Sequence, residues 1–144
     1  MNSREAAHWD EKRWEEEYES LMEIARSHLR PEWEAGEVLV VKTIGGNIYV
    51  AEISDFQDPA VREPLENRLI QRLAEQNDTE AFVCVATING KQPEIPSWNF
   101  RSRLLELNEK NLQTQTFLWG GGEAIFLKPL SRLLPPNYKI EKGT

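Results

Sequence analysis

One segment combines a hydroxyl, an aromatic ring and guanidinium groups at a spacing suited to ligand binding: Pro96-Ser97-Trp98-Asn99-Phe100-Arg101-Ser102-Arg103. Ser97 is expected to cap a helix that begins at Trp98, and the first amides of a helix are unpaired donors that attract an anion. Arg101 follows Trp98 by one turn and flanks the same place. The segment therefore predicts ligand contacts by Ser97, Trp98 and Arg101. A simpler alternative is that Trp98 and Phe100 pack under a sheet while the arginines lie in water.

A run of three glycines, Gly120, Gly121 and Gly122, is the second candidate for ligand contact. Glycine lets backbone amides approach an anion closely. A dinucleotide-binding loop, however, needs a further glycine where Ile125 stands and a helix after it, and a Walker loop needs a Lys followed by Ser or Thr. We therefore predict a hairpin turn between two strands and keep a ligand-contacting loop as the alternative.

Metal-binding and catalytic motifs are not recognisable in the sequence. His8 and His28 are the two histidines, and along a straight helix they would stand about 30 Å apart, too far to share one metal ion. Cys84 is the single cysteine and lies in the apolar run Phe82-Val83-Cys84-Val85, where it is expected to be buried. The 24 acidic residues offer no preferred acid–base pair. We therefore assign no catalytic residue, no metal site and no cofactor.

The first helix should begin at an Asp10 cap and end before Pro31. Six residues recur on one face at steps of three and four, namely Trp14, Tyr18, Leu21, Met22, Ala25 and Leu29. Acidic residues occupy the other faces. Residues 1–30 are thus predicted to form an acidic amphipathic helix that also serves association, with Trp9, Trp14 and Tyr18 at an interface.

The remaining periodicities predict one α+β domain over residues 1–144, in the order α-ββ-α-β(β)-α-ββ. Strands are expected over 37–43, 47–53, 81–88, about 91–95, 113–119 and 123–128. Helices are expected over 64–76, after a short turn at 59–63, and over 98–107. Leu65, Leu69 and Leu73 should form the buried stripe of the middle helix. Short turns such as Asn89-Gly90 favour a largely antiparallel or mixed sheet of five to six strands. Helices are expected to pack on one face, with the first helix at the sheet edge.

Composition limits the classes of partner. The chain has 144 residues, 40% hydrophobic and 28% charged, and carries a net charge of −7. Residues 1–90 hold 9 basic against 19 acidic side chains, so nucleic acid is not an expected partner. No apolar stretch approaches the roughly 18 residues of a membrane span, and the first residues lack the apolar core of an export signal. The sequence therefore predicts a cytoplasmic protein with no membrane contact.

Two functional hypotheses remain. The leading one is a non-enzymatic protein-interaction or regulatory module, either a homodimer or a binder of a basic protein, because the acidic tryptophan-bearing helix resembles a docking face. The alternative is a small enzyme or an anion- or nucleotide-ligand binder. Its site would lie between the helix start at Trp98–Arg103 and the turn at Gly120–Gly122.

Overall fold

The computed structural model describes residues 9–33 and 36–135, which contain three α-helices and one mixed sheet of six strands. The helices are α2 (Glu11–Ser27), α3 (Pro59–Glu75) and α4 (Trp98–Leu107). The strands are β1 (Glu37–Thr43), β2 (Ile48–Ile53), β3 (Ala81–Ile88), β4 (Pro93–Glu94), β5 (Gln115–Trp119) and β6 (Ile125–Pro129). Two short 3-10 helices cover Glu109–Gln113 and Leu130–Arg132. The predicted α+β class, with a mixed sheet and three helices, is confirmed.

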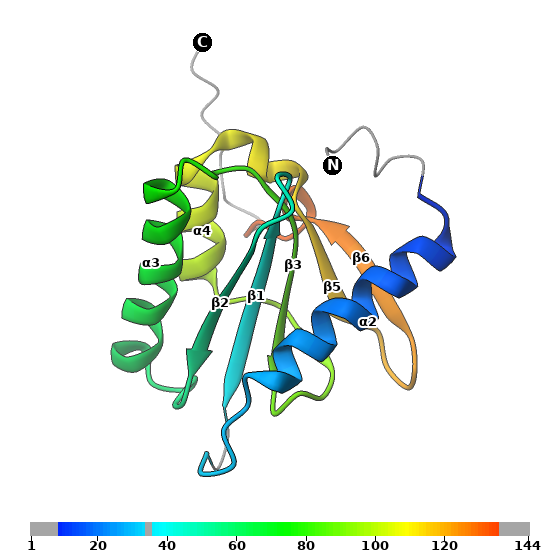
Figure 1. The fold of residues 1–144 in the computed structure, drawn as a ribbon, viewed down its shortest axis with the longest axis horizontal. Helices are drawn as coiled ribbons and strands as arrows, with labels where there is room; N and C mark the ends of the chain where they lie inside the picture. The colour runs from blue at the N-terminus through cyan, green and yellow to red at the C-terminus, as the bar shows by residue number, and fades with distance from the viewer. Residues whose placement is uncertain (1–8, 34–35, 136–144) are drawn as a thin grey trace.

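The strands follow the order β2-β1-β3-β5-β6, and the short β4 pairs with the remaining part of β3. The β3–β5 pair is parallel, whereas the other pairs are antiparallel. Because parallel strands end at the same edge of a sheet, the turns that follow β3 and β5 lie at one edge (Figure 1). None of the described helices is long and apolar enough to cross a membrane.

Helices cover both faces of the sheet, so the prediction that helices pack on one face, with the first helix at the sheet edge, is wrong. In β1, Leu39 and Val41 join the core under α3 and α4, whereas Val38 and Val40 face α2. Figure 1 shows α2 crossing one side of the sheet, apart from α3 and α4. The continuous apolar runs of β1 and β3 are the physical reason, since a strand without polar alternation must be covered twice.

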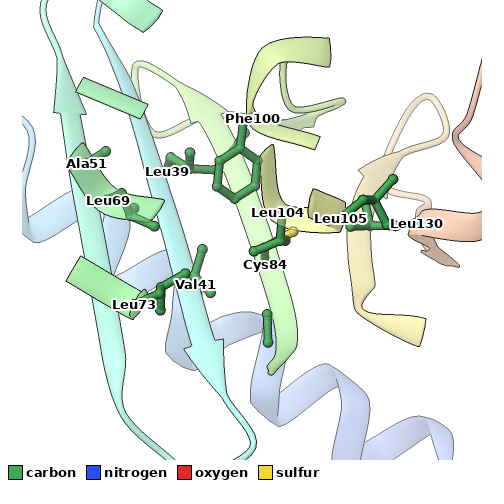
Figure 2. Close-up of a cluster of buried hydrophobic side chains, with 12 residues drawn as sticks. Leu39, Val41, Ala51, Leu69, Leu73, Cys84, Phe100, Leu104, Leu105 and Leu130 are labelled. Atoms are coloured by element: carbon green, nitrogen blue, oxygen red, sulfur yellow. The ribbon is translucent and has the colours of Figure 1, made fainter. Parts of the chain in front are cut away.

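The core under α3 and α4 is a single apolar cluster that fixes both helices against the sheet. Leu69 and Leu73 come from α3, while Phe100 and Leu104 come from α4, and all four are fully buried. These side chains gather over β1 and β3 (Figure 2). The cluster holds α3 and α4 side by side, so that polar residues at their junction are brought together.

Helix α3 differs from the sequence prediction in two respects. It runs without interruption from Pro59 and is capped by Asp58, although Pro64 was expected to separate a turn from the main helix. Pro64 lies on the exposed side and removes one backbone hydrogen bond, a loss that the burial of the opposite face outweighs. The buried stripe contains Glu66 where Leu65 was expected, because positions 66, 69 and 73 share one face at steps of three and four. A carboxylate is thereby placed in the interior.

The Asn89-Gly90 turn joins β3 to β4, as the sequence predicts, and both residues have positive φ angles of 55° and 70°. The end of α2 packs on this turn, because Arg26 Nε donates to the Gly90 carbonyl at 3.1 Å. A Cβ atom on Gly90 would stand 2.7 Å from Leu29 Cδ1. The turn therefore requires glycine for its conformation and for its contact with α2.

Two glycine substitutions separate these requirements. Gly121→Ala, at a φ of 97° with no atom near the added carbon, should lower the free energy of unfolding by about 1 kcal/mol. Gly90→Ala carries a similar conformational cost and also brings the added carbon close to the Leu29 and Arg26 side chains, so it should cost somewhat more. Urea unfolding of both variants measures the difference. Equal losses in the free energy of unfolding would show that the close contact at Gly90 adds no cost.

Candidate functional site

A buried carboxylate lies where α3 meets the start of α4. Glu66 is fully buried. Its two carboxylate oxygens accept hydrogen bonds from Ser97 Oγ at 2.8 and 2.7 Å, and one of them also accepts from Asn99 Nδ2 at 3.0 Å. Ser97 in turn accepts from the Phe100 amide at 3.1 Å, which fixes its hydroxyl at the helix start. The arrangement holds the carboxylate by hydrogen bonds from two neutral side chains.

A guanidinium group stands beside this carboxylate. Arg62 Nε lies 3.8 Å from Glu66 Oε2, one helical turn earlier on α3, and the side chain also donates to the Phe56 carbonyl at 2.6 Å. Arg62 Nε is buried and has no hydrogen-bond partner among the described residues. The Asn99 amide extends the network to Asn67 Oδ1 at 3.0 Å. We call Arg62, Glu66, Asn67, Ser97 and Asn99 the Glu66 cluster.

A second acid lies close to the Glu66 cluster. Glu37, the first residue of β1, is 6% exposed. The pKa of Glu37 is raised to about 7: burial is the largest cause, the charges of Glu66 and Glu94 also raise it, and Arg62 opposes the rise. Glu37 therefore changes charge near neutral pH, where an acid–base group is most effective.

The predicted ligand residues at the start of α4 lie beside the Glu66 cluster, and Ser97 belongs to it. The Trp98 side chain is 36% exposed, and the Arg101 guanidinium lies 5.3 Å from the centre of its ring. Arg101 also donates to the backbone carbonyls of Pro96, at 2.8 Å, and Leu133. Burial lowers the pKa of Arg101. Arg101 thus ties the start of α4 to the C-terminal part of the chain, and its contact with a ligand stays a prediction.

The glycine run forms the turn between β5 and β6. Gly121 and Gly122 have positive φ angles, and the Gly120 amide donates to the Ala124 carbonyl at 2.8 Å. Trp119 Nε1 donates to the Gly122 carbonyl at 2.9 Å. The turn therefore orients an indole ring. Ligand contact by Gly120, Gly121 or Gly122 stays a prediction.

A groove of about 900 Å³ separates α2 from the β5–β6 hairpin. Trp14, Tyr18, Trp119 and Gly122 are among the residues that line it. The groove lies on the face of the sheet that α2 covers, opposite to α3 and α4. It is therefore separate from the Glu66 cluster.

The three residues predicted as an interface pack largely on the chain's own sheet. Trp9 and Trp14 stand 5.2 and 5.5 Å from the Phe82 ring, and Tyr18 stands 5.1 Å from the Phe117 ring. Helix α2, capped by Asp10 as expected, therefore covers a sheet face and does not lie at the sheet edge. Association through Trp9, Trp14 and Tyr18, including a homodimer, stays a prediction.

Sequence reasoning missed the acidic residues of this region. Glu66 precedes Leu69 and Leu73 by three and seven positions, so its place on the apolar face was visible in the sequence. Arg62 lies one turn before it on the same helix. Glu37 opens an apolar strand and gave no comparable signal, because its burial depends on elements distant in the chain.

The sequence matches no protein-family model and is not significantly similar to any of the curated proteins compared. The fold is similar to solved cytidine deaminases. That of Bacillus anthracis superposes with a TM-score of 0.66 at 14% identity, over 83% of this chain and 88% of the other. The enzyme of Mycobacterium leprae has a TM-score of 0.62 at 12% identity, over 82% of this chain and 97% of the other. The enzyme of Burkholderia pseudomallei has a TM-score of 0.61 at 14% identity, over 84% of this chain and 98% of the other. At this level of identity, the likeness establishes a shared fold.

Zinc deaminases hold their metal ion with histidine and cysteine ligands, and the residues of this chain do not fit such a site. Within the described residues, no three His, Cys, Asp or Glu side chains are grouped to hold a metal ion. Cys84 is fully buried in β3, and burial raises the pKa of its thiol to about 11, which disfavours the thiolate. His28 stands at the end of α2 near Glu52, and His8 lies outside the described residues. The Glu66 cluster offers no donor set for zinc.

These comparisons correct the functional hypothesis drawn from the sequence. The solved structures that share the fold are enzymes, so the leading hypothesis of a non-enzymatic protein-interaction or regulatory module is contradicted. The alternative, a small enzyme or ligand binder with its site between the helix start at Trp98–Arg103 and the turn at Gly120–Gly122, agrees better with them as to class. The fold is that of the solved cytidine deaminases, and its α3–α4 junction holds a buried carboxylate without metal ligands.

Proposed function

We propose that the chain binds a small ligand with a nucleobase-like edge at the Glu66 cluster, and that Glu66 exchanges protons with it without a metal ion. The observation that carries the proposal is the Glu66 carboxylate, fully buried between α3 and α4 and bonded by the neutral donors Ser97 and Asn99. A carboxylate within hydrogen-bond reach of neighbouring polar side chains is one of the groups that acid–base sites use.

The hydrogen-bonding groups of the Glu66 cluster indicate the class of ligand. A carboxylate accepts from an amino group, whereas the amide of Asn99 both donates and accepts. Cytosine presents an amino donor next to ring acceptors, so its edge matches this pair. Uracil carries a carbonyl in place of the amino group, which would face the carboxylate without a hydrogen bond. Cytidine is therefore the first nucleoside to test, and the name of the solved enzymes with this fold points the same way.

Access to the carboxylate depends on its neighbours. Glu66 has no exposed surface, while Ser97 and Asn99 are half-buried. A ligand therefore reaches Glu66 by replacing the Asn99 bond of 3.0 Å with one of its own. Trp98, exposed beside Asn99, supplies an aromatic face on which a base can stack. A cytoplasmic location belongs to this proposal, since the chain has a single cysteine and a reducing compartment is compatible with it.

Calorimetric titration with cytidine and uridine tests the proposal. The protein should bind cytidine more tightly than uridine. Glu66→Gln keeps the side-chain size but removes the charged acceptor, and should weaken cytidine binding by about tenfold or more. Glu63→Gln, one turn earlier on the same helix, should leave binding unchanged. Far-UV circular dichroism verifies that both variants are folded.

Two outcomes would contradict the proposal. One is that neither nucleoside binds to the folded protein at millimolar concentration. The other is that cytidine binds equally well to the wild type and to folded Glu66→Gln, which would place its site elsewhere.

A further inference from the structure

Two segments of the Glu66 cluster have the residue spacing of a zinc-deaminase signature. That signature is H-x-E followed by P-C-x-x-C, where the histidine and both cysteines bind zinc and the glutamate moves protons. This chain has Pro64-Leu65-Glu66 and Pro96-Ser97-Trp98-Asn99-Phe100. The glutamate of the first motif and the proline of the second are present. The three positions that would bind the metal are occupied by Pro64, Ser97 and Phe100.

The structure brings these two segments together. Ser97, at the position of the first cysteine, donates its hydroxyl hydrogen bond to the Glu66 carboxylate at 2.7 to 2.8 Å. Phe100 follows by one turn on α4, and therefore lies on the same side of the helix. Pro64 precedes Glu66 by two residues on α3. Ser97 thus contacts Glu66 and Phe100 follows it on α4, whereas Pro64 lies on the exposed side of α3.

None of the three replacing side chains suits zinc. Proline has no side-chain donor atom, and the Phe100 ring is a fully buried part of the apolar core. The Ser97 hydroxyl is neutral, and its hydrogen bonds go to Glu66 and to the Phe100 amide. Zinc sites require thiolate, imidazole or carboxylate ligands in a tetrahedral arrangement. The chain therefore keeps the glutamate of the signature, Glu66, and has no metal ligand at the three other positions.

We infer that the Glu66 cluster is a deaminase-type centre in which three metal-binding positions have become Pro64, Ser97 and Phe100, while Glu66 keeps its place. The Ser97 hydroxyl and the Phe100 ring hold α4 against α3 where the signature would place cysteines. The inference rests on the proposed function for the ligand. Its prediction about metal binding is independent of whether any nucleoside binds.

Restoring the signature tests the inference. The purified wild type should hold no stoichiometric zinc by elemental analysis. The triple variant Pro64→His/Ser97→Cys/Phe100→Cys should acquire about one zinc ion per folded chain, and its cobalt form should show the intense absorption of tetrahedral thiolate ligation. In the matched control Ser97→Cys/Phe100→Cys, Pro64 is kept. This control lacks the third protein ligand and should bind zinc more weakly than the triple variant does.

The loss of the Phe100 ring from the core can unfold the triple variant. The double variant Pro64→His/Ser97→Cys retains that ring and should still bind cobalt more tightly than the wild type does. The inference is overturned by about one zinc ion per wild-type chain, by a folded triple variant without zinc, or by a double variant no better than the wild type. Zinc acquisition together with absent cytidine binding would leave this inference intact and reject the proposed function.

Discussion

Asn111→Ala should be among the most destabilising substitutions in the chain, with a loss of about 3–5 kcal/mol in the free energy of unfolding. Asn111 is fully buried in the 3-10 helix Glu109–Gln113. Its side chain accepts from the Ala81 amide at 2.8 Å and donates to the carbonyls of Leu104 at 2.8 Å and Thr79 at 2.9 Å. Each buried group left unpaired costs about 1–3 kcal/mol, and alanine leaves these groups unpaired.

Asn111 joins several elements, so its replacement should weaken the packing between them as well as its own hydrogen bonds. Its bonds to Ala81 and Leu104 join the start of β3 and helix α4 to the 3-10 helix between α4 and β5, and its side-chain oxygen also accepts from Thr114 Oγ1 at 3.3 Å. Thermal or urea unfolding measures the change. Asn108→Ala is the matched control, since Asn108 caps the same 3-10 helix but is only half-buried, and it should cost about 1 kcal/mol. Similar losses for the two variants would show that the buried network is not what fixes α4.

The free energy of unfolding of Glu37→Gln, taken relative to the wild type, should be about 2 kcal/mol higher at pH 8 than at pH 5. Burial raises the folded-state pKa of Glu37 from the ordinary 4.5 to about 7. The folded state therefore binds this proton more tightly than the unfolded state does. The stability that the protonated acid provides is fully present below pH 4.5 and is lost as pH rises through 7. Glutamine is neutral throughout, so the variant avoids that loss.

Urea unfolding of wild type and Glu37→Gln at pH 5, 6, 7 and 8 measures this effect. Glu94→Gln is the control, because Glu94 is exposed and makes the smallest contribution to the pKa of Glu37. Its difference from the wild type should change little with pH. A difference between Glu37→Gln and wild type that stays constant from pH 5 to pH 8 would show that Glu37 does not titrate in this range.

Much of the local structure can be predicted from short sequence signals such as turn and cap residues. β3 and α4 have the predicted bounds, because Asn89-Gly90 ends the strand and Ser97 caps the helix. The arrangement of these elements depends on contacts that no local signal specifies. The parallel pairing of β3 with β5, and the placement of α2 on the opposite face, follow from which apolar surfaces cover one another.

The candidate site was predicted in part. Ser97 and Trp98 were selected because a helix start attracts ligands, and the structure places Ser97 against a buried acid. The acid itself was missed, since the apolar stripe of α3 was assigned to Leu65 and the structure buries Glu66 instead. The hydrogen-bond partner of the Glu66 carboxylate comes from another helix, so the sequence of α3 alone does not reveal it. Ser97 and Glu66 are 31 residues apart, and folding alone brings them together.

The most direct test of the account is the location of ligand contacts on a nitrogen-15-labelled chain titrated with cytidine. We expect the largest amide shifts at residues 62–67 and 97–101, which form the Glu66 cluster and the exposed Trp98 beside it. Folded Glu66→Gln should lose these shifts at the same cytidine concentration. Shifts confined to the groove at Trp14, Trp119 and Gly122, or no shifts at saturating cytidine, would contradict a ligand site at the junction of α3 and α4.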